Sequence, residues 1–314
     1  MVLEQLRTHD GFVSGEELCR QCGISRQALW KQVQELRERG YEIESVPHLG
    51  YRLASAPDRL YPEELLAGLG TKAVGRCIHY FEKTASTMDE AMRLGPAAAE
   101  GTLVVAESQQ RGRGRLGRSW SSPGHKGIYA SLILKPDILP NQAPVLALMA
   151  SVSICGGIEE ACGVRCGIKW PNDIILDGEK LGGILTELKA ELDTVRFVVI
   201  GFGINVNSGA EALVKGAASL QRKTGEPVCR PALLRAVLRH IEKDYHTFRS
   251  KGPAPLLEQW KALSVTLGRK VRVECHHDRV EGEAVELDAD GGLLVRRDTG
   301  VVQKFFAGDI VHLR

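Results

Sequence analysis

Residues 112–120 read Gly-Arg-Gly-Arg-Leu-Gly-Arg-Ser-Trp, so three arginines alternate with three glycines. Glycine has no Cβ, so its backbone can approach a ligand closely, and arginine offers a forked set of donors that suits phosphate and carboxylate oxygens. This pattern is typical of a loop that closes over an anion. Taken alone, however, it is more often a solvated arginine-rich loop or an RNA-binding patch.

The glycines of this loop also fit the dinucleotide-binding pattern G-x-G-x-x-G, which requires a helix directly after it. The residues that follow are Ser-Ser-Pro-Gly-His-Lys-Gly, and they do not begin a helix. The sequence contains no G-x-x-x-x-G-K-[ST] nucleotide loop either. We therefore reject a Rossmann or P-loop site.

Four other polar motifs flank the glycine–arginine loop. They are Ser86-Thr87-Met88-Asp89, Lys169-Trp170-Pro171-Asn172-Asp173, Lys180-Leu181-Gly182-Gly183-Ile184-Leu185 and Gly201-Phe202-Gly203-Ile204-Asn205-Val206-Asn207. The second of these, in isolation, is more often a strand followed by a proline turn with an Asx cap. In this order and spacing, the set resembles the biotin protein ligases. With the N-terminal segment described below, nearly the whole chain resembles the bifunctional biotin ligases that also repress the biotin operon.

The resemblance implies a reaction in two steps. Biotin and Mg-ATP form biotinyl-5′-AMP, and biotin then passes to a lysine of a biotin carboxyl carrier domain. By resemblance, biotin contacts come from Ser86, Thr87, Met88, Gln109, Arg113, Gly114, Arg115 and Lys180. ATP or adenylate contacts come from Arg113, Arg115, Arg118, Trp120, Lys169, Asn172 and Asn205. The catalytic residues are Lys180, Arg115, Asp173 and Lys169.

Each of these charges answers a physical need of that scheme. Carboxylate and phosphate repel each other as they approach, so the loop arginines and Lys180 are expected to neutralise both groups. The attacking lysine of the carrier is mostly ammonium at neutral pH, because its pKa is about 10.4. Asp173 is our first choice to orient that ammonium or accept its proton. Magnesium is expected to enter with ATP, near Asn172 or Asp173, and no separate metal site is predicted.

Two residues depart from the family pattern. Met88 stands where the Ser-Thr pair is often followed by asparagine, which removes a polar contact to the ligand. Leu116 occupies a commonly basic position of the loop, where it is expected to alter adenylate retention or its coupling to dimerisation. Neither change is expected to abolish the chemistry.

Residues 1–62 predict a winged helix-turn-helix DNA-binding domain. Ser14 and Ser25 are capping residues for the second and third helices, and Gly23 supplies the turn between them. Alternating residues at 41–46 and 50–53 predict the wing. The expected DNA-binding residues lie at the start of the third helix, which usually enters the major groove: Ser25, Arg26, Gln27, Trp30, Lys31 and Gln34. Residues 1–60 carry eight basic and nine acidic side chains, so a solvated helix face is the alternative.

Residues 63–267 predict a mixed α/β catalytic domain with a largely antiparallel sheet, because several strands follow one another through short turns such as Asp177-Gly178. The predicted strands are 103–106, 128–134, 174–176, 184–188 and 197–200, and the predicted helices are 146–161, 233–248 and 256–263. The resemblance implies a class II synthetase or lipoate–biotin ligase scaffold. Residues 268–314 alternate in short runs that predict a small β-barrel, SH3-like by resemblance.

Composition is that of an ordinary α+β multidomain protein, with 25% charged residues, 43% hydrophobic residues and a net charge of +2. We find no apolar run long enough to cross a bilayer and no signal peptide, so the chain is expected to be cytoplasmic, without a membrane partner. Its eight cysteines are expected to be reduced, and neither Cys19-x-x-Cys22 nor Cys275-His276-His277 groups four metal ligands.

The expected partners are the carrier domain, operator DNA and a second copy of the chain in a ligand-promoted homodimer. Two other functions remain open. One is a lipoate or octanoyl ligase on the same scaffold, which would need a long apolar tunnel and usually lacks the glycine–arginine loop. The other is a ligand-sensing repressor without catalysis, which would have lost Lys180 or the arginines. This chain keeps those residues.

Overall fold

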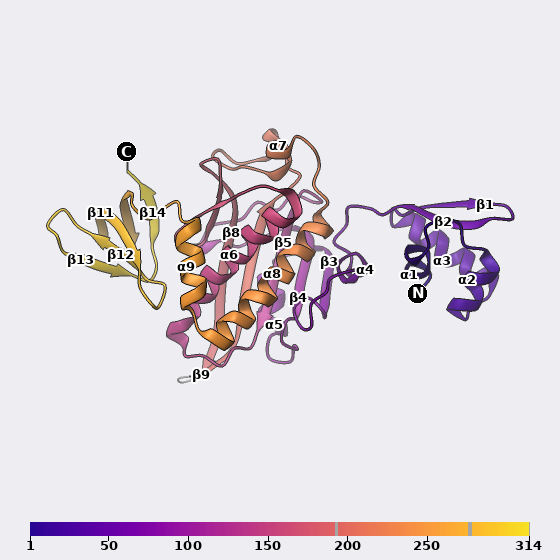
Figure 1. The fold of residues 1–314 in the computed structure, drawn as a ribbon, viewed down its shortest axis with the longest axis horizontal. Helices are drawn as coiled ribbons and strands as arrows, with labels where there is room; N and C mark the ends of the chain where they lie inside the picture. Colours follow the sequence, from indigo (N-terminus) through magenta and orange to yellow (C-terminus); the bar gives the residue numbers. More distant parts are fainter. Residues whose placement is uncertain (192–193, 276–277, 314) are drawn as a thin grey trace. The chain divides into compact units, whose positions relative to one another are not determined.

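The computed structural model describes residues 1–191, 194–275 and 278–313. The chain forms two compact units, Met1–Asp58 and Arg59–Arg314, and Figure 1 traces both. The domain boundaries predicted at residues 62 and 267 remain predictions. Each unit is described by itself.

The first unit contains three helices and a hairpin: α1 (Val2–Thr8), α2 (Gly15–Cys22), α3 (Arg26–Glu38), β1 (Glu42–Val46) and β2 (Gly50–Ser55). The predicted caps form, because Ser14 Oγ accepts from Glu17 N at 3.1 Å and Ser25 Oγ accepts from Ala28 N at 3.2 Å. Gly23 ends α2 in the left-handed region at φ +65°. The helix-turn-helix with a wing is thus confirmed.

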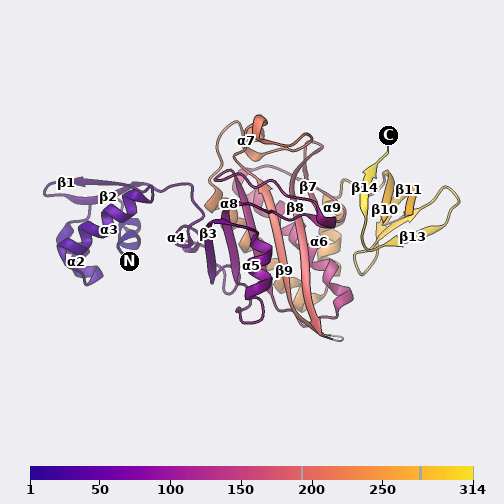
Figure 2. The ribbon, with the colours of Figure 1, turned by 180° about the vertical axis from the view of Figure 1, so that it is seen from behind.

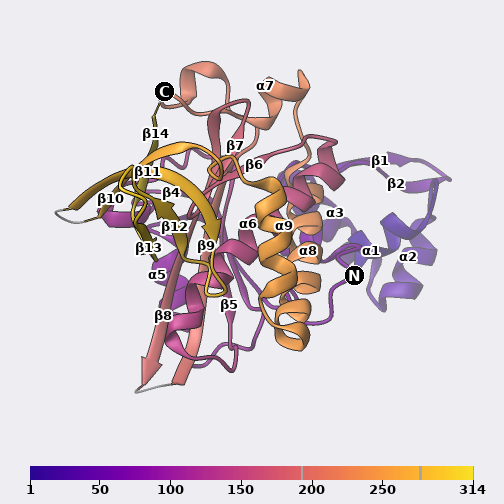
Figure 3. The ribbon, with the colours of Figure 1, turned by 60° about the vertical axis from the view of Figure 1, so that its left-hand side comes forward.

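The second unit is built on a seven-stranded sheet with the order β3-β4-β5-β9-β8-β7-β6. Among the strands of this sheet that the structure describes, β3 and β4 alone pair with each other in parallel, so the expected mixed, largely antiparallel sheet is confirmed. The strands are β3 (Ile78–Thr84), β4 (Leu103–Gln109), β5 (Gly127–Leu134), β6 (Gly167–Lys169), β7 (Asp173–Leu176), β8 (Glu179–Glu191) and β9 (Thr194–Asn205). Strands β8 and β9 extend beyond the ends of their neighbours (Figure 3).

Helices cover both faces of this sheet because its central strands, such as β4 and β5, are buried at consecutive residues and therefore on both sides. One face packs against the long helices α6 (Ala143–Cys162), α8 (Arg230–Lys251) and α9 (Ala254–Leu263), as Figure 1 shows. The other face carries α5 (Thr87–Leu94), which comes forward in Figure 2. Shorter helices are α4 (Pro62–Leu66) and α7 (Leu220–Thr224). Single 3-10 turns lie at Arg115–Gly117, Pro140–Gln142 and Ala210–Ala212.

Helix α6 corrects one expectation from the sequence. The segment Pro140–Cys162 is long and apolar enough to cross a membrane by length and composition, although no such run was expected. Its apolar window is 67% buried inside the protein, because α6 packs against the sheet and against helices α8 and α9. A core helix of this kind passes the same test as a membrane span, so α6 is weak evidence for one.

The C-terminal residues form a separate five-stranded antiparallel sheet in the order β13-β12-β11-β10-β14. Its strands are β10 (Lys270–Cys275), β11 (Asp278–Leu287), β12 (Leu293–Arg296), β13 (Val302–Phe305) and β14 (Asp309–His312). It is tied to the catalytic part by Trp170, whose Nε1 donates to Gly291 O at 3.3 Å. His276 and His277 of the Cys-His-His motif lie outside the described residues. Within those residues, no three His, Cys, Asp or Glu side chains group as metal ligands.

Candidate active site

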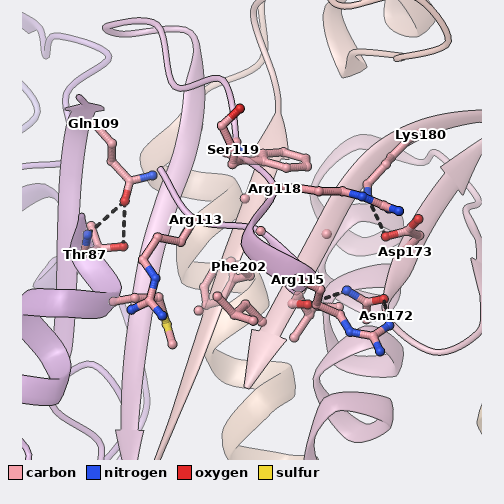
Figure 4. Close-up of a pocket in the computed structure, with 18 of the residues that line it drawn as sticks. Thr87, Gln109, Arg113, Arg115, Arg118, Ser119, Asn172, Asp173, Lys180 and Phe202 are labelled. Atoms are coloured by element: carbon pink, nitrogen blue, oxygen red, sulfur yellow. Dashed lines mark hydrogen bonds and ion pairs between the residues drawn. The ribbon is translucent and has the colours of Figure 1, made fainter. Parts of the chain in front are cut away.

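A pocket lies between α5, the glycine–arginine loop and strands β8 and β9, and Figure 4 shows it in close-up. Eleven of the sequence-predicted ligand contacts line it: Thr87, Met88, Gln109, Arg113, Gly114, Arg115, Arg118, Trp120, Asn172, Asp173 and Lys180. The structure therefore brings together four of the five polar motifs around one cavity through these side chains. The Gly201–Asn207 motif supplies part of the cavity wall.

The wall is made of glycines because larger residues would not fit there. A Cβ on Gly203 would collide with the indole of Trp120, and a Cβ on Gly201 would collide with the sulfur of Met88. Both glycines are on β9, where a bare backbone lets an aromatic ring and a thioether lie directly against the sheet. The Gly-x-Gly spacing thus places both missing side chains on the same face of the strand.

One end of the pocket is a network of neutral polar groups. Gln109 Oε1 accepts hydrogen bonds from Thr87 N at 2.8 Å and Thr87 Oγ1 at 3.1 Å. Thr87 Oγ1 in turn accepts from Ser131 Oγ at 2.9 Å. Gln109 Nε2 donates to Ser122 Oγ at 2.9 Å. Such amide and hydroxyl groups suit a neutral ligand group with both donors and acceptors, such as a cyclic urea.

The opposite end of the pocket carries an ion pair between Lys180 Nζ and Asp173 Oδ1 at 2.6 Å (Figure 4). The β7–β8 hairpin positions both residues, and its turn residues Asp177 and Gly178 both have positive φ, as a tight two-residue hairpin requires. Lys180 Nζ also lies 5.6 Å from the centroid of the Trp120 ring. The lysine is thereby held at the pocket between a carboxylate and an aromatic face.

All three loop arginines are held by acceptors from other elements. Arg115 donates to Asn172 Oδ1 at 3.0 Å, and burial lowers the pKa of Arg115 while the charges of Asp309 and Asp173 oppose that shift. Arg118 pairs with Asp309 of β14. Arg113 pairs with two carboxylates, Asp89 of α5 at 2.7 Å and Glu187 of β8.

Three predicted ligand residues do not line the pocket. Ser86 is fully buried at the start of α5, and its Oγ has no hydrogen-bond partner among the described residues. Lys169 is half-buried, and burial lowers its pKa while the charge of Asp173 opposes that shift. Asn205 Nδ2 donates to Ala218 O at 3.1 Å and so holds the segment that follows β9.

Sequence reasoning missed several residues of the pocket. Asp309 comes from β14, far from the other motifs in the chain, and no local pattern around it indicated a site. Ser119 lies inside the glycine–arginine loop but was not assigned a role. Leu185 and Phe202 also line the pocket: Leu185 was predicted only as part of a strand, and Phe202 was quoted in its motif without a role.

Comparison with known proteins assigns all three parts of the chain. Residues 79–205 match the biotin/lipoate A/B protein ligase family, residues 2–52 match a helix-turn-helix domain, and residues 266–313 match the biotin protein ligase C-terminal domain. The bifunctional ligase/repressor BirA of Bacillus subtilis (strain 168) is 40% identical over 304 residues, which are 95% of this chain and 93% of that protein. The chain belongs to the bifunctional biotin ligase/repressor family.

Other biotin ligases show how the match is distributed. BirA of Escherichia coli (strain K12) is 30% identical and again covers 95% of the chain. A solved biotin protein ligase from Aquifex aeolicus, in complex with biotin and ATP, superposes with a TM-score of 0.66 at 27% identity. It covers 76% of this chain and 99% of its own, so the ligase scaffold is matched almost completely by a part of this bifunctional chain.

Proposed function

We propose that the protein is an ATP-dependent biotin protein ligase that forms biotinyl-5′-AMP and transfers biotin to a lysine of a biotin carboxyl carrier domain. It also represses biotin genes in response to biotin. One observation carries the ligase proposal. A neutral hydrogen-bonding end at Thr87 and Gln109 faces a cationic end at Lys180 and Arg115 across one pocket. That polarity fits biotin, whose ring is neutral and whose reacting end is an anion.

The loop arginines then serve the first step by exchanging partners. Arg113 and Arg118 are 40% and 66% exposed, and exposed ion pairs are worth about 0–1 kcal/mol. The ligand's carboxylate and phosphate oxygens can therefore replace the protein carboxylates at little cost. Lys180 bridges the two anionic groups as they meet, where its charge stabilises the transition state. Asn172 and Asp173 carry oxygen ligands that suit Mg²⁺, which would neutralise phosphate charge when it enters with ATP.

Asp173 serves the second step. Once the adenylate has formed, the carrier's lysine must reach the acyl carbon beside Lys180, and its ammonium must lose a proton. Asp173, 2.6 Å from Lys180, is close enough to hold that ammonium in place. Its role is to orient the incoming ammonium and stabilise its charge, because a carboxylate is a weaker base than the amine that it would have to deprotonate.

The repressor half rests on the first unit and on an open strand edge. Arg26 and Lys31 lie at the N-terminal part of α3, where a recognition helix contacts bases and phosphates. In the described part of the chain, β7 pairs with β8 only from Glu179 to Gly183, and Asn172 then bonds the backbone of Ile184. From Leu185 onward β8 has β9 as a strand neighbour on one side alone. An unpaired edge is a template for another strand. We infer that a second copy pairs there in a ligand-promoted dimer in the cytoplasm.

Calorimetric titration of the protein with biotin, lipoate and ATP tests the ligase proposal. We expect sub-micromolar binding of biotin, no comparable binding of lipoate, and transfer of biotin to a carrier domain when ATP is present. Preference for lipoate would replace the proposal with a lipoyl ligase on the same scaffold. Biotin binding without any transfer would leave a ligand-sensing repressor.

A further inference from the structure

A buried ion pair lies outside the pocket, at the sheet edge that contains β3 and β4. Glu107 of β4 and Arg230 at the start of α8 are both fully buried, and their charged atoms are 2.8 Å apart. Arg230 also donates to Gly127 O at 3.1 Å. Removing two charges from water costs several kcal/mol per ion unless each is paired. The pair is therefore a fixed point of the fold, and nothing in the two proposed reaction steps uses it.

The first residues after the DNA-binding unit are attached to this fixed point. The first unit ends at Asp58. Two residues later, Leu60 is fully buried and its backbone N–H donates to Glu107 Oε1 at 2.8 Å. Between them, Arg59 contacts the His125 ring nitrogens at 2.5 and 2.7 Å and pairs with Glu82 at 3.0 Å. Arg59 and Leu60, the first two residues of the second unit, are thus both bound to this region of the catalytic domain.

The same fixed point holds the segment that leaves the glycine–arginine loop. His125 Nδ1 lies 3.1 Å from Glu107 Oε2, and its Nε2 lies 3.2 Å from Glu82 Oε1. The backbone of His125 has φ +60°, a left-handed conformation that costs energy in a non-glycine residue and is kept here by these contacts. Three residues earlier, Ser122 accepts from Gln109 at the base of the loop. The stretch from Ser122 to His125 therefore joins the loop base to these ion pairs. We call them the Glu107 cluster, which consists of Glu107, Arg230, Glu82, Arg59 and His125.

We propose that His125 and Arg59 couple the glycine–arginine loop to the segment from which the DNA-binding unit leaves, and this rests on the proposed function as a biotin-responsive repressor. Binding of the adenylate repositions the loop, and its base at Ser122 moves with it. His125 carries this displacement to Arg59 because it contacts both the cluster and the guanidinium. Since coupling between two sites is reciprocal, DNA binding also stabilises the liganded loop.

The test uses the full-length protein and its operator fragment. Operator affinity is measured with and without biotin plus ATP, and the ratio of the two affinities reports the coupling. We expect Arg59→Ala and His125→Ala to lower this ratio about tenfold, while biotin transfer to the carrier domain stays within about twofold. His125→Asn should restore most of the ratio, because asparagine tolerates the left-handed backbone and keeps a polar contact.

Arg249→Ala is the matched control, because Arg249 also forms an ion pair with a glutamate, Glu100, but at the other end of the unit's helix α8. Its ratio should equal that of the wild type. Unchanged ratios in both Arg59→Ala and His125→Ala overturn the coupling. A parallel loss of thermal stability and biotin transfer in these variants overturns it too, because the role is then structural. A wild type whose operator affinity ignores biotin and ATP overturns the repressor proposal itself.

Discussion

The glycine–arginine loop and the Glu107 cluster are both held by ion pairs, but they differ in burial. Arg113 and Arg118 of the loop are 40% and 66% exposed, whereas Glu107 and Arg230 are fully buried. The exposed pairs are weak enough for ligand anions to replace them. Removing one partner of the buried pair is strongly destabilising, because the other loses the opposite charge that compensates for its burial. Similar chemistry thus provides an exchangeable contact at the pocket and a permanent one at the sheet edge.

The largest effect should come from breaking the buried pair. Glu107→Ala removes the buried carboxylate that pairs with Arg230, so the free energy of unfolding should fall by about 3–5 kcal/mol. Urea denaturation of the full-length protein measures this. The control is Glu82→Ala, because Glu82 belongs to the same cluster but is 55% exposed; it should cost less than about 1 kcal/mol. Equal losses in the free energy of unfolding for the two variants would show that burial does not determine how much these ion pairs stabilise the fold.

The Lys180–Asp173 pair lies between the two extremes of burial and acts on chemistry. Lys180→Ala should slow adenylate formation by about 10²–10³-fold, the usual effect of removing one charge-stabilising group. Transfer from pre-formed biotinyl-5′-AMP should fall much less, because the two anions have already joined. Single-turnover assays of each half-reaction decide this, with Lys189→Ala on the same strand as control. Equal losses in both half-reactions would contradict the bridging role.

Ion pairs of the DNA-binding unit belong at the exposed extreme. Lys31 is 76% exposed, and its contact with Glu35 is long at 3.8 Å. Its ammonium is therefore available for a phosphate. Lys31→Ala should weaken operator binding by about 1 kcal/mol and lower the salt slope by about one, and Arg26→Ala should weaken binding similarly or more. Gel-shift titrations at several salt concentrations measure both effects. Biotin transfer should not change, and Arg20→Ala on α2 should leave DNA binding intact.

The smallest effect should come from the ion pair between Arg113 of the loop and Asp89 of α5. Asp89→Ala removes one of two carboxylates on Arg113, so global stability should change by less than about 1 kcal/mol. Trypsin should nevertheless cut the ligand-free loop after Arg113 or Arg115 up to about fivefold faster, and biotin should protect it. Glu90→Ala, which breaks a pair within α5, is the control. Equal cleavage rates in Asp89→Ala and wild type would show that the Arg113–Asp89 ion pair does not hold the loop.

The sequence predicted the site better where its motifs are local. Asp173 and Lys180 belong to one hairpin, whose Asp177-Gly178 turn was visible in the sequence, so their proximity follows from strand pairing. Strand β3 and helix α5 were not predicted, although the Ser-Thr motif at the start of α5 was noticed for its chemistry. Helix α6 was predicted three residues too short at its start and one at its end, and helix α8 was predicted three residues too short at each end.

Contacts over long sequence separations were beyond the sequence. Asp309 faces Arg118 across 191 residues, and Glu107 meets Arg230 across 123. Neither acidic residue belongs to a motif, and only three-dimensional packing brings them to their partners. Lys169 and Asn205 do not line the pocket, because a motif gives a residue's neighbourhood but not the direction of its side chain; their roles remain predictions.

The position of Trp120 has an optical consequence. The chain has four tryptophans. Trp170 and Trp260 are buried in the core, and Trp30 is exposed on α3. Trp120 lines the pocket, against Gly203 and near Lys180. A ligand that enters the pocket changes the surroundings of this indole while the two core indoles stay as they are. The intrinsic fluorescence of Trp120 therefore reports whether the pocket is occupied. Replacing Trp30 by phenylalanine would remove the signal that comes from the DNA-binding unit.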